Sequence, residues 1–100
     1  MPEWIYFIHP PREHFAETMT PEEDQVWSEH FARLQRLLDD GTLVLAGPTL
    51  GPINTGVVII DAPDEATARR IMEDDPTIAK GYARGELRRF RVSLIRGRPG

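Results

Sequence analysis

The sequence predicts a single α+β domain in which a four-stranded antiparallel sheet carries two helices on one face. The chain has 100 residues, which is enough for one hydrophobic core but not for two. Four short apolar segments have the residue types of strands, and two other segments have apolar residues at helical spacing. Their order along the chain is β-α-β-β-α-β, which is the order of a ferredoxin-like sandwich.

The composition is that of an ordinary soluble globular protein, with 40% hydrophobic and 28% charged residues. The chain has no cysteine, which excludes disulfides and thiol chemistry. A formal net charge of −4 gives no general attraction to nucleic acid. No apolar run has membrane-spanning length, and the first residues are too poor in basic side chains for a signal peptide. We therefore expect a cytoplasmic protein without a nucleic-acid or membrane partner.

The first strand and the first helix have clear boundary signals. Residues 4–9 (WIYFIH) are aromatic and β-branched, and the two prolines that follow end the strand. After a polar loop, Thr20 is the expected N-cap of a helix, because a proline suits the next position and Glu23 can complete a capping box. The helix is expected to end near residue 39, with Gly41 as its C-terminal stop.

The rest of the chain supplies three strands and two shorter helical segments. In order, these are a strand over 42–48, a strand over 55–62, a helix over 62–75 capped by Asp64, one further helical turn capped by Asp75, and a strand over 86–95. In the last strand Phe90, Val92 and Leu94 alternate with polar residues, which is the pattern of a half-buried strand. We expect one domain over residues 1–100, with a flexible tail over about 96–100.

The first and third strands predict a partner for the sheet. Both are central in this topology, and both are apolar on their two faces. Because the helices cover one face only, either Trp4, Tyr6 and Ile8 or Ile5 and Phe7 point away from them. An exposed apolar face of that size is unusual for a monomer. We therefore expect a homodimer that pairs two sheets face to face, with two-fold symmetry.

One histidine of the first helix, His30, lies on the apolar side of the helix. Residues at about 100° intervals define an apolar stripe, and His30 falls within roughly 40° of its centre. The stripe comprises Trp27, Phe31, Leu34, Leu37 and Leu38, whereas Arg33 falls elsewhere. One interpretation is a core histidine whose ring nitrogens bond a backbone carbonyl or a water. The other is a general acid/base tuned by partial burial and a nearby carboxylate.

A catalytic histidine needs a partner that orients its ring. Asp74 and Asp75 are the candidates, because the second helix ends there and both helices pack on the same face of the sheet. Asp75 also suits the N-cap of the next helical turn, and the two roles are compatible because a carboxylate has two oxygens. Glu23 lies near the same face, two turns before His30, and its competing role is that of the capping-box acid.

Other candidate ligand-binding residues have weaker signals. His9 and His14 could join His30 as three nitrogen ligands, but polar loop residues are the competing interpretation. Without an HExxH motif or a cysteine pair we expect no metal, and without a phosphate loop or dinucleotide fingerprint we expect no cofactor. Arginines crowd the C-terminal end. They suit a solvated strand face, or a site in which Arg89 meets an anionic group.

These candidates sit within a pattern that resembles the YciI-like (YCII-related) family. Two stretches carry the resemblance, EEDQVWSEHFARLQRLLDDGTLVLAGP and DDPTIAKGY. The matching residues are His30, Gly41, Ala46, Gly47, Pro48, Asp75 and Pro76. The family often has an aromatic residue after its DP dipeptide, and this chain has Thr77 there.

The resemblance implies a ferredoxin-like fold of the dimeric α/β-barrel class and a His–Asp active site, which falls on His30 and Asp75. One group of the family resembles enzymes that eliminate chloride from hydroxylated aromatics, and muconolactone isomerases share the broader fold.

Three functions remain open from the sequence. The first is a small cofactor-independent enzyme, in which His30 moves a proton on an aromatic or lactone-like metabolite and Asp75 holds the imidazole. The second is a non-catalytic dimeric module that binds a metabolite or regulates. The third is an interaction protein in which His30 only packs.

Overall fold

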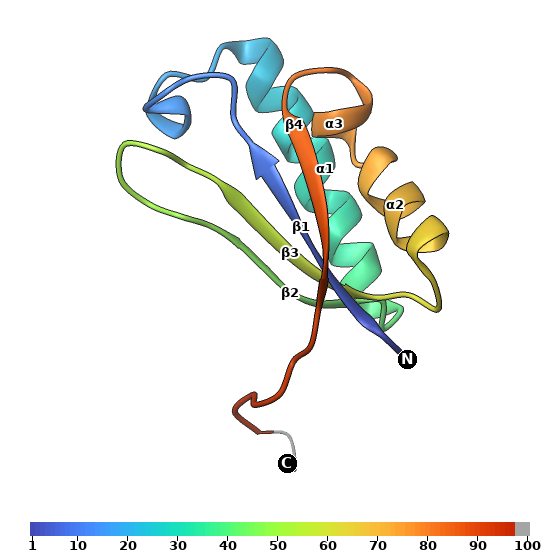
Figure 1. Ribbon diagram of the computed structural model, residues 1–100. Coiled ribbons are helices and arrows are strands. Elements are labelled where there is room, and N and C mark those ends of the chain that lie inside the picture. The colour runs from blue at the N-terminus through green and yellow to red at the C-terminus, as the bar shows by residue number, and fades with distance from the viewer. Residues whose placement is uncertain (98–100) are drawn as a thin grey trace.

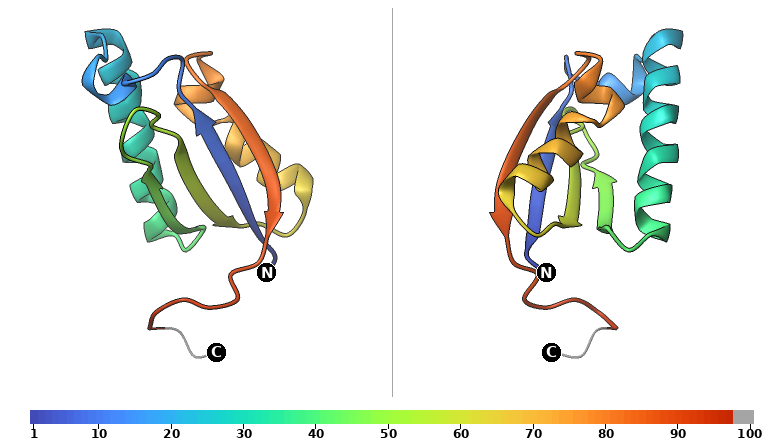
Figure 2. Two further views of the ribbon diagram at one scale, coloured as in Figure 1. Left: turned by 60° about the vertical axis from the view of Figure 1, so that its left-hand side comes forward. Right: turned by 90° about the vertical axis from the view of Figure 1, so that its right-hand side faces the viewer.

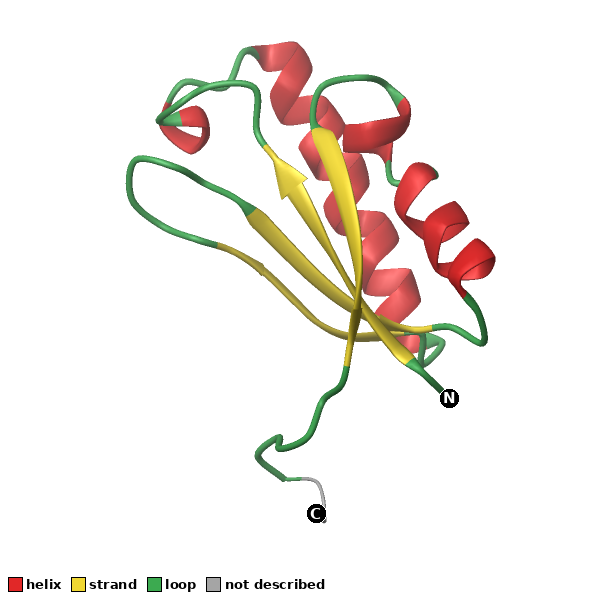
Figure 3. Ribbon diagram, viewed as in Figure 1, coloured by secondary structure: helices red, strands yellow, loops and turns green. Residues whose placement is uncertain are grey.

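The computed structural model describes residues 1–97, and in that range the helices cover one face of a four-stranded antiparallel sheet (Figures 1 and 3). The elements are β1 (Glu3–His9), a 3-10 turn η1 (Phe15–Glu17), α1 (Pro21–Asp39), β2 (Leu43–Pro48), β3 (Gly56–Asp61), α2 (Glu65–Glu73), α3 (Pro76–Ala79) and β4 (Arg84–Phe90). The strand order is β2-β3-β1-β4, which confirms the predicted ferredoxin-like fold. Of the tail expected over 96–100, residues 98–100 lie outside the described part.

The helices lie on one side of the sheet and leave its outer face uncovered (Figure 2). The central strand β1 contributes side chains to both faces. Trp4, Tyr6 and Ile8 alternate inward and are buried with residues of β3 and the helices. Ile5 and Phe7 therefore point away from the helices, which resolves the alternative that the sequence left open. No helix among residues 1–97 is long and apolar enough to cross a membrane.

The last strand is shorter than predicted. It ends at Phe90, and the prediction of a half-buried strand up to residue 95 is wrong. Phe90 is 39% exposed and Leu94 is 88% exposed. The reason lies in the neighbouring strand, because β1 begins at Glu3, which pairs with Phe90. Beyond that point β1 offers no backbone for the chain to pair with. Leu87 is the β4 side chain that packs against the core.

The apolar stripe of α1 is also narrower than predicted. Leu34 is buried, but Phe31 is 62% exposed and Leu38 is 55% exposed, so the apolar stripe defined by the spacing is only partly buried. A helical wheel gives the angle of a side chain about the helix axis. It does not show what lies beneath that side chain, and Phe31 lines a cavity beside the core.

The start of α1 has the predicted capping box, reinforced from the preceding loop. The Glu23 backbone N–H donates to the Thr20 side chain at 3.1 Å, and the Glu23 carboxylate accepts from the Thr20 N–H at 2.9 Å. Arg12 donates to both oxygens of that carboxylate, at 2.8 and 2.9 Å. The hydrogen bond from Arg12, then that from Thr20, lowers the pKa of Glu23 from 4.5 to about 2.

This lowered pKa predicts how stability depends on pH. A carboxylate whose pKa is lower in the folded protein stabilises it above its unfolded pKa, and that contribution is lost as the pH falls through the folded value. We expect the melting temperature of the wild type to exceed that of Glu23→Gln by a constant amount above pH 5. The difference shrinks between the two pKa values of 4.5 and about 2.

Thermal denaturation followed by circular dichroism over this pH range measures the difference. Glu13→Gln is the matched control, because it removes an exposed carboxylate from the loop before α1 and leaves the capping box of Glu23 intact. A gap between the wild type and Glu23→Gln that stays constant down to pH 2 would contradict the assignment.

Candidate active site

His30 and Asp75 are in direct contact, although 45 positions separate them in the sequence. His30 projects from the middle of α1, and Asp75 lies at the junction of α2 and α3. The Nδ1 atom of His30 lies 3.0 Å from Oδ1 and 2.9 Å from Oδ2 of Asp75. The His30 side chain is 12% exposed, whereas that of Asp75 is fully buried.

Three further donors complete the surroundings of the Asp75 carboxylate. The Tyr6 hydroxyl, from β1, donates to Oδ2 at 2.7 Å. The backbone N–H and the hydroxyl of Thr77 donate to Oδ1 at 3.1 and 2.8 Å. The contact with the Thr77 N–H is the N-cap of α3, so this carboxylate caps a helix and holds a histidine, as the sequence suggested.

These contacts determine the charges in the cluster. Burial by itself raises the pKa of Asp75. The hydrogen bond and charge of His30, with the bonds from Tyr6 and Thr77, outweigh burial and hold that pKa below its ordinary value. Burial and the adjacent carboxylate raise the pKa of Tyr6, so its phenol stays protonated as a donor. An ionised carboxylate only accepts hydrogen bonds, so Nδ1 of His30 carries a proton and Nε2 of the neutral ring has a free lone pair.

Arg33 adds a half-buried positive charge that was not predicted from the sequence. Its Nη2 donates to the Ile71 carbonyl of α2 at 3.0 Å, and its charge lowers the pKa of Tyr6 against the larger effect of burial. Its Nη1 is buried and has no hydrogen-bond partner within the described residues. The helical wheel set Arg33 apart from the apolar stripe. The available signal was its spacing from His30, since residues three apart are neighbours on a helix.

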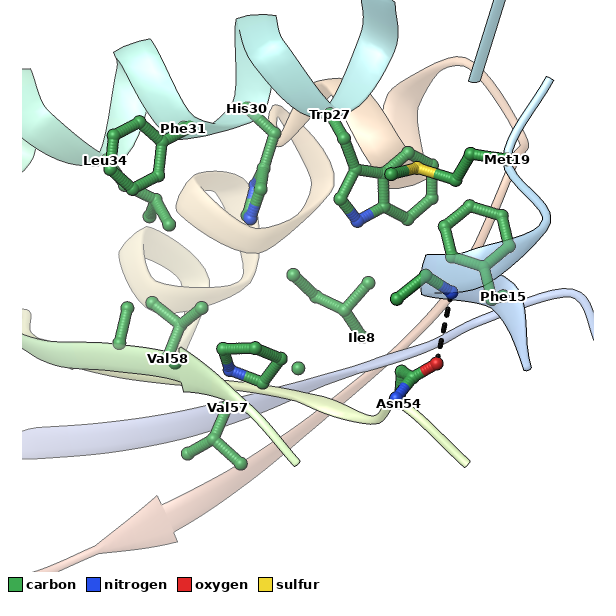
Figure 4. A pocket seen from close by; sticks show the side chains of 15 residues that line it. Ile8, Phe15, Met19, Trp27, His30, Phe31, Leu34, Asn54, Val57 and Val58 are labelled. Carbon is green, nitrogen blue, oxygen red and sulfur yellow. Dashed lines mark hydrogen bonds between the residues drawn. The ribbon is translucent and has the colours of Figure 1, made fainter. Parts of the chain in front are cut away.

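His30 also lines a cavity of about 330 Å³ between α1, the ends of β2 and β3, and the loop that contains η1 (Figure 4). The cavity is lined by Ile8, Phe15, Ala16, Met19, Trp27, His30, Phe31, Leu34, Ala46, Gly47, Pro48, Asn54, Gly56, Val57 and Val58. The imidazole points from α1 into this space. Because Nδ1 is turned to Asp75, the opposite nitrogen, Nε2, is the one available to a ligand.

One wall of the cavity is formed by the loop after β1, which is hydrogen-bonded to the loop between β2 and β3. The His14 N–H donates to the Pro52 carbonyl at 2.7 Å, and the Ala16 N–H donates to Asn54 Oδ1 at 3.1 Å (Figure 4). His14 has a φ of 55°, a left-handed conformation that is uncommon outside glycine. The position of this wall therefore depends on contacts between two loops.

The other histidine candidate near β1 does not join this site. His9 lies at the end of β1, where its Nε2 is 2.9 Å from Glu86 Oε1 and its ring stacks on Phe7. Phe7 belongs to the outer face of the sheet, so His9 does as well. Among the described residues, no group of three or more histidine and acidic side chains is placed to hold a metal ion.

The remaining predicted site residues also lie apart from His30. Glu23 is engaged by Arg12 at the start of α1. Asp74 is the exposed C-cap residue of α2, and the Arg89 guanidinium lies 4.9 Å from the centre of the Trp4 ring. None of these residues lines the cavity. Of the six site residues predicted from the sequence, the structure thus brings together only His30 and Asp75.

This fold and this site define a small ferredoxin-like domain in which an aspartate holds a histidine at the edge of a cavity. The chain belongs to the YCII-related domain family, whose model matches residues 5–91, and this confirms the family predicted from the sequence. No curated protein matches the chain.

A solved structure supports the fold. The chain is similar to 5-chloro-2-hydroxyhydroquinone dehydrochlorinase (TftG) from Burkholderia phenoliruptrix AC1100, solved in complex with 2,5-dihydroxybenzoquinone. The sequence identity is 18%, the TM-score is 0.65, and the match covers 88% of this chain and 93% of the other. At this identity the similarity shows a shared fold.

The contact between Tyr6 and Asp75 yields a test of the cluster. Tyr6→Phe removes one donor from a buried carboxylate, so we expect the free energy of unfolding to fall by about 1–3 kcal/mol. The pKa of Asp75 should rise, because the Tyr6 hydrogen bond is among the causes that lower it. Urea denaturation and NMR titration of the Asp75 carboxyl carbon measure the two effects.

Tyr82→Phe is the matched control, since Tyr82 is the only other tyrosine and is only half-buried. A Tyr6→Phe variant that is as stable as Tyr82→Phe, with the pKa of Asp75 unchanged, would show that the hydroxyl does not support the carboxylate.

Proposed function

We propose that this protein is a small enzyme that uses His30 as a general acid/base on a metabolite bound in the cavity. The observation that carries the proposal is the arrangement of the imidazole. Nδ1 is held by an ionised, fully buried Asp75, while Nε2 faces a cavity large enough for a small ligand. A base in this position accepts a proton from the ligand and returns it after the bonds have rearranged.

Asp75 acts in this proposal by orienting the ring and by stabilising its protonated form. When Nε2 takes a proton, the imidazolium lies within 3.0 Å of a carboxylate that water does not reach. The attraction is stronger there than at the surface, because the interior screens charge poorly. General acid/base catalysis of this kind typically contributes about 10²–10⁴-fold to a rate.

The cavity wall favours a small, uncharged and largely apolar ligand. Apart from His30, no side chain that lines the cavity can carry a charge, so nothing in the wall would pair with a phosphate or a carboxylate. The volume of about 330 Å³ is near the lower end for ligand pockets and suits a single ring. An aromatic or lactone-like metabolite with a weakly acidic proton fits these properties, and the ligand in the TftG structure is also a small ring.

We further propose that the protein is a homodimer through the outer face of the sheet. Ile5 and Phe7 of β1 lie there beside Val57 of β3, each only half-buried, and Leu45 of the edge strand β2 is 43% exposed. A second copy that presents the same face would remove these side chains from water.

His30→Ala tests the catalytic proposal. We expect phenols and lactones that stabilise the wild type in a thermal-shift screen to be converted, or to exchange a carbon-bound proton for deuterium, in NMR spectra recorded in D₂O. The variant should keep its fold and lose about 100-fold or more of this activity. His9→Ala, which alters a histidine on the opposite face, should keep it.

Ligands that stabilise the protein without conversion or exchange would instead support a non-catalytic binding module. Equal stabilisation of His30→Ala and the wild type by every such ligand would contradict any role of His30 in this cavity.

Ile5→Glu tests the dimer. Sedimentation should give the wild type twice the chain mass of 11.4 kDa and the variant a single chain mass, because a charge on the outer face opposes its burial. Leu38→Glu, at an exposed position of α1, should remain dimeric. Circular dichroism checks that each variant is folded, and a monomeric wild type would contradict the proposal.

A further inference from the structure

The two tryptophans of the chain differ in the use of their indole N–H groups. Trp4 donates from Nε1 to the Ala62 carbonyl at 3.1 Å. Trp27 lies on α1, three residues before His30, and its Nε1 donates to no residue within 1–97. This Nε1 atom is also not fully buried. Figure 4 shows the indole nitrogen directed into the cavity, beside the His30 ring. This donor is therefore open to whatever occupies the cavity.

The indole is also held in place before any ligand binds. Its ring packs against Phe15 with centroids 4.6 Å apart, and the Arg12 guanidinium lies 5.1 Å from the centre of the Phe15 ring. Arg12 in turn is fixed by its two hydrogen bonds to Glu23. A donor that is already oriented loses little conformational freedom on binding, so its hydrogen bond contributes more to affinity.

Few other polar side-chain atoms can meet a ligand here. Of the side chains that line the cavity, those with nitrogen or oxygen atoms are Trp27, His30 and Asn54. Asn54 is engaged, because its Oδ1 accepts from Ala16 and its Nδ2 donates to the carbonyls of Thr49 and Gly51. What remains is one N–H that only donates, at Trp27, and one lone pair that accepts, at His30 Nε2.

We infer that Trp27 determines ligand specificity, and that the ligand carries two oxygens on one small ring. One oxygen is an acidic hydroxyl that donates to His30 Nε2, and the other accepts a hydrogen bond from the Trp27 indole. This inference rests on the proposed function and narrows its substrate class to rings with a second oxygen, such as dihydroxybenzenes. A ring with a single hydroxyl has only one oxygen to share between His30 and the Trp27 donor, and it binds more weakly.

NMR titration with phenol, catechol, resorcinol and hydroquinone tests the inference in the intact protein. Spectra that correlate ¹H with ¹⁵N contain one indole signal for Trp27 and one for Trp4. We expect at least one dihydroxybenzene to bind about five-fold more tightly than phenol, the effect of one hydrogen bond. That ligand should move the indole N–H signal of Trp27 downfield and leave that of Trp4 in place.

Trp27→Phe supplies the second measurement, with Trp4→Phe as the matched control. Trp27→Phe should abolish the advantage of the dihydroxybenzene over phenol, whereas Trp4→Phe should preserve it. The inference is overturned if the advantage survives in Trp27→Phe, if phenol is weakened equally, or if the wild-type indole signal of Trp27 does not respond to a bound dihydroxybenzene. If neither phenol nor any dihydroxybenzene binds the folded wild type, the proposed ligand class fails, and the inference falls with it.

Discussion

The carboxylate of Asp75 is the constraint on which the arrangement of this small domain depends. A buried charge costs several kcal/mol unless hydrogen bonds replace its hydration. Here the donors come from three different elements, with Tyr6 on β1, His30 on α1 and Thr77 on α3. The strand, the long helix and the short helix are therefore positioned against one another by a single polar group inside an otherwise apolar core. Arg33 places a positive charge that acts on Tyr6, and its hydrogen bond to Ile71 links α1 to α2.

What the sequence predicted well is what short-range chemistry determines. The capping box of Thr20 and Glu23 and the cap at Asp75 involve residues within three positions of each other, so their residue types are sufficient to place them. The approach of His30 to Asp75 came from topology, because two helices on one face of a sheet bring their facing side chains together. The extent of β4 depends on where β1 begins, which the local pattern of β4 does not contain. The free N–H of Trp27 was missed because its ring counted only as part of an apolar stripe.

The cavity combines a rigid part with a part assembled from loops. His30 is fixed from beneath by a buried cluster, whereas the opposite wall depends on contacts of His14 with Pro52 and of Ala16 with Asn54. Such pairings join segments about 38 positions apart, and neither segment indicates the other in its own residues. The sequence therefore located the candidate histidine more readily than the shape of the space around it. The homodimer and the cytoplasmic location stay predictions.

Asp75 both caps α3 and binds the side chain of His30, and this combination has an evolutionary consequence. Because the aspartate also begins α3 and anchors Tyr6, a descendant that lost the activity proposed for His30 would still need the aspartate to hold these elements together. His30 donates to the same carboxylate but caps no helix, so selection for stability alone would preserve it less strictly than the aspartate. When relatives of this chain are sorted into active and inactive lineages, retention of the histidine is thus the informative character, and retention of the aspartate reports mainly a shared architecture.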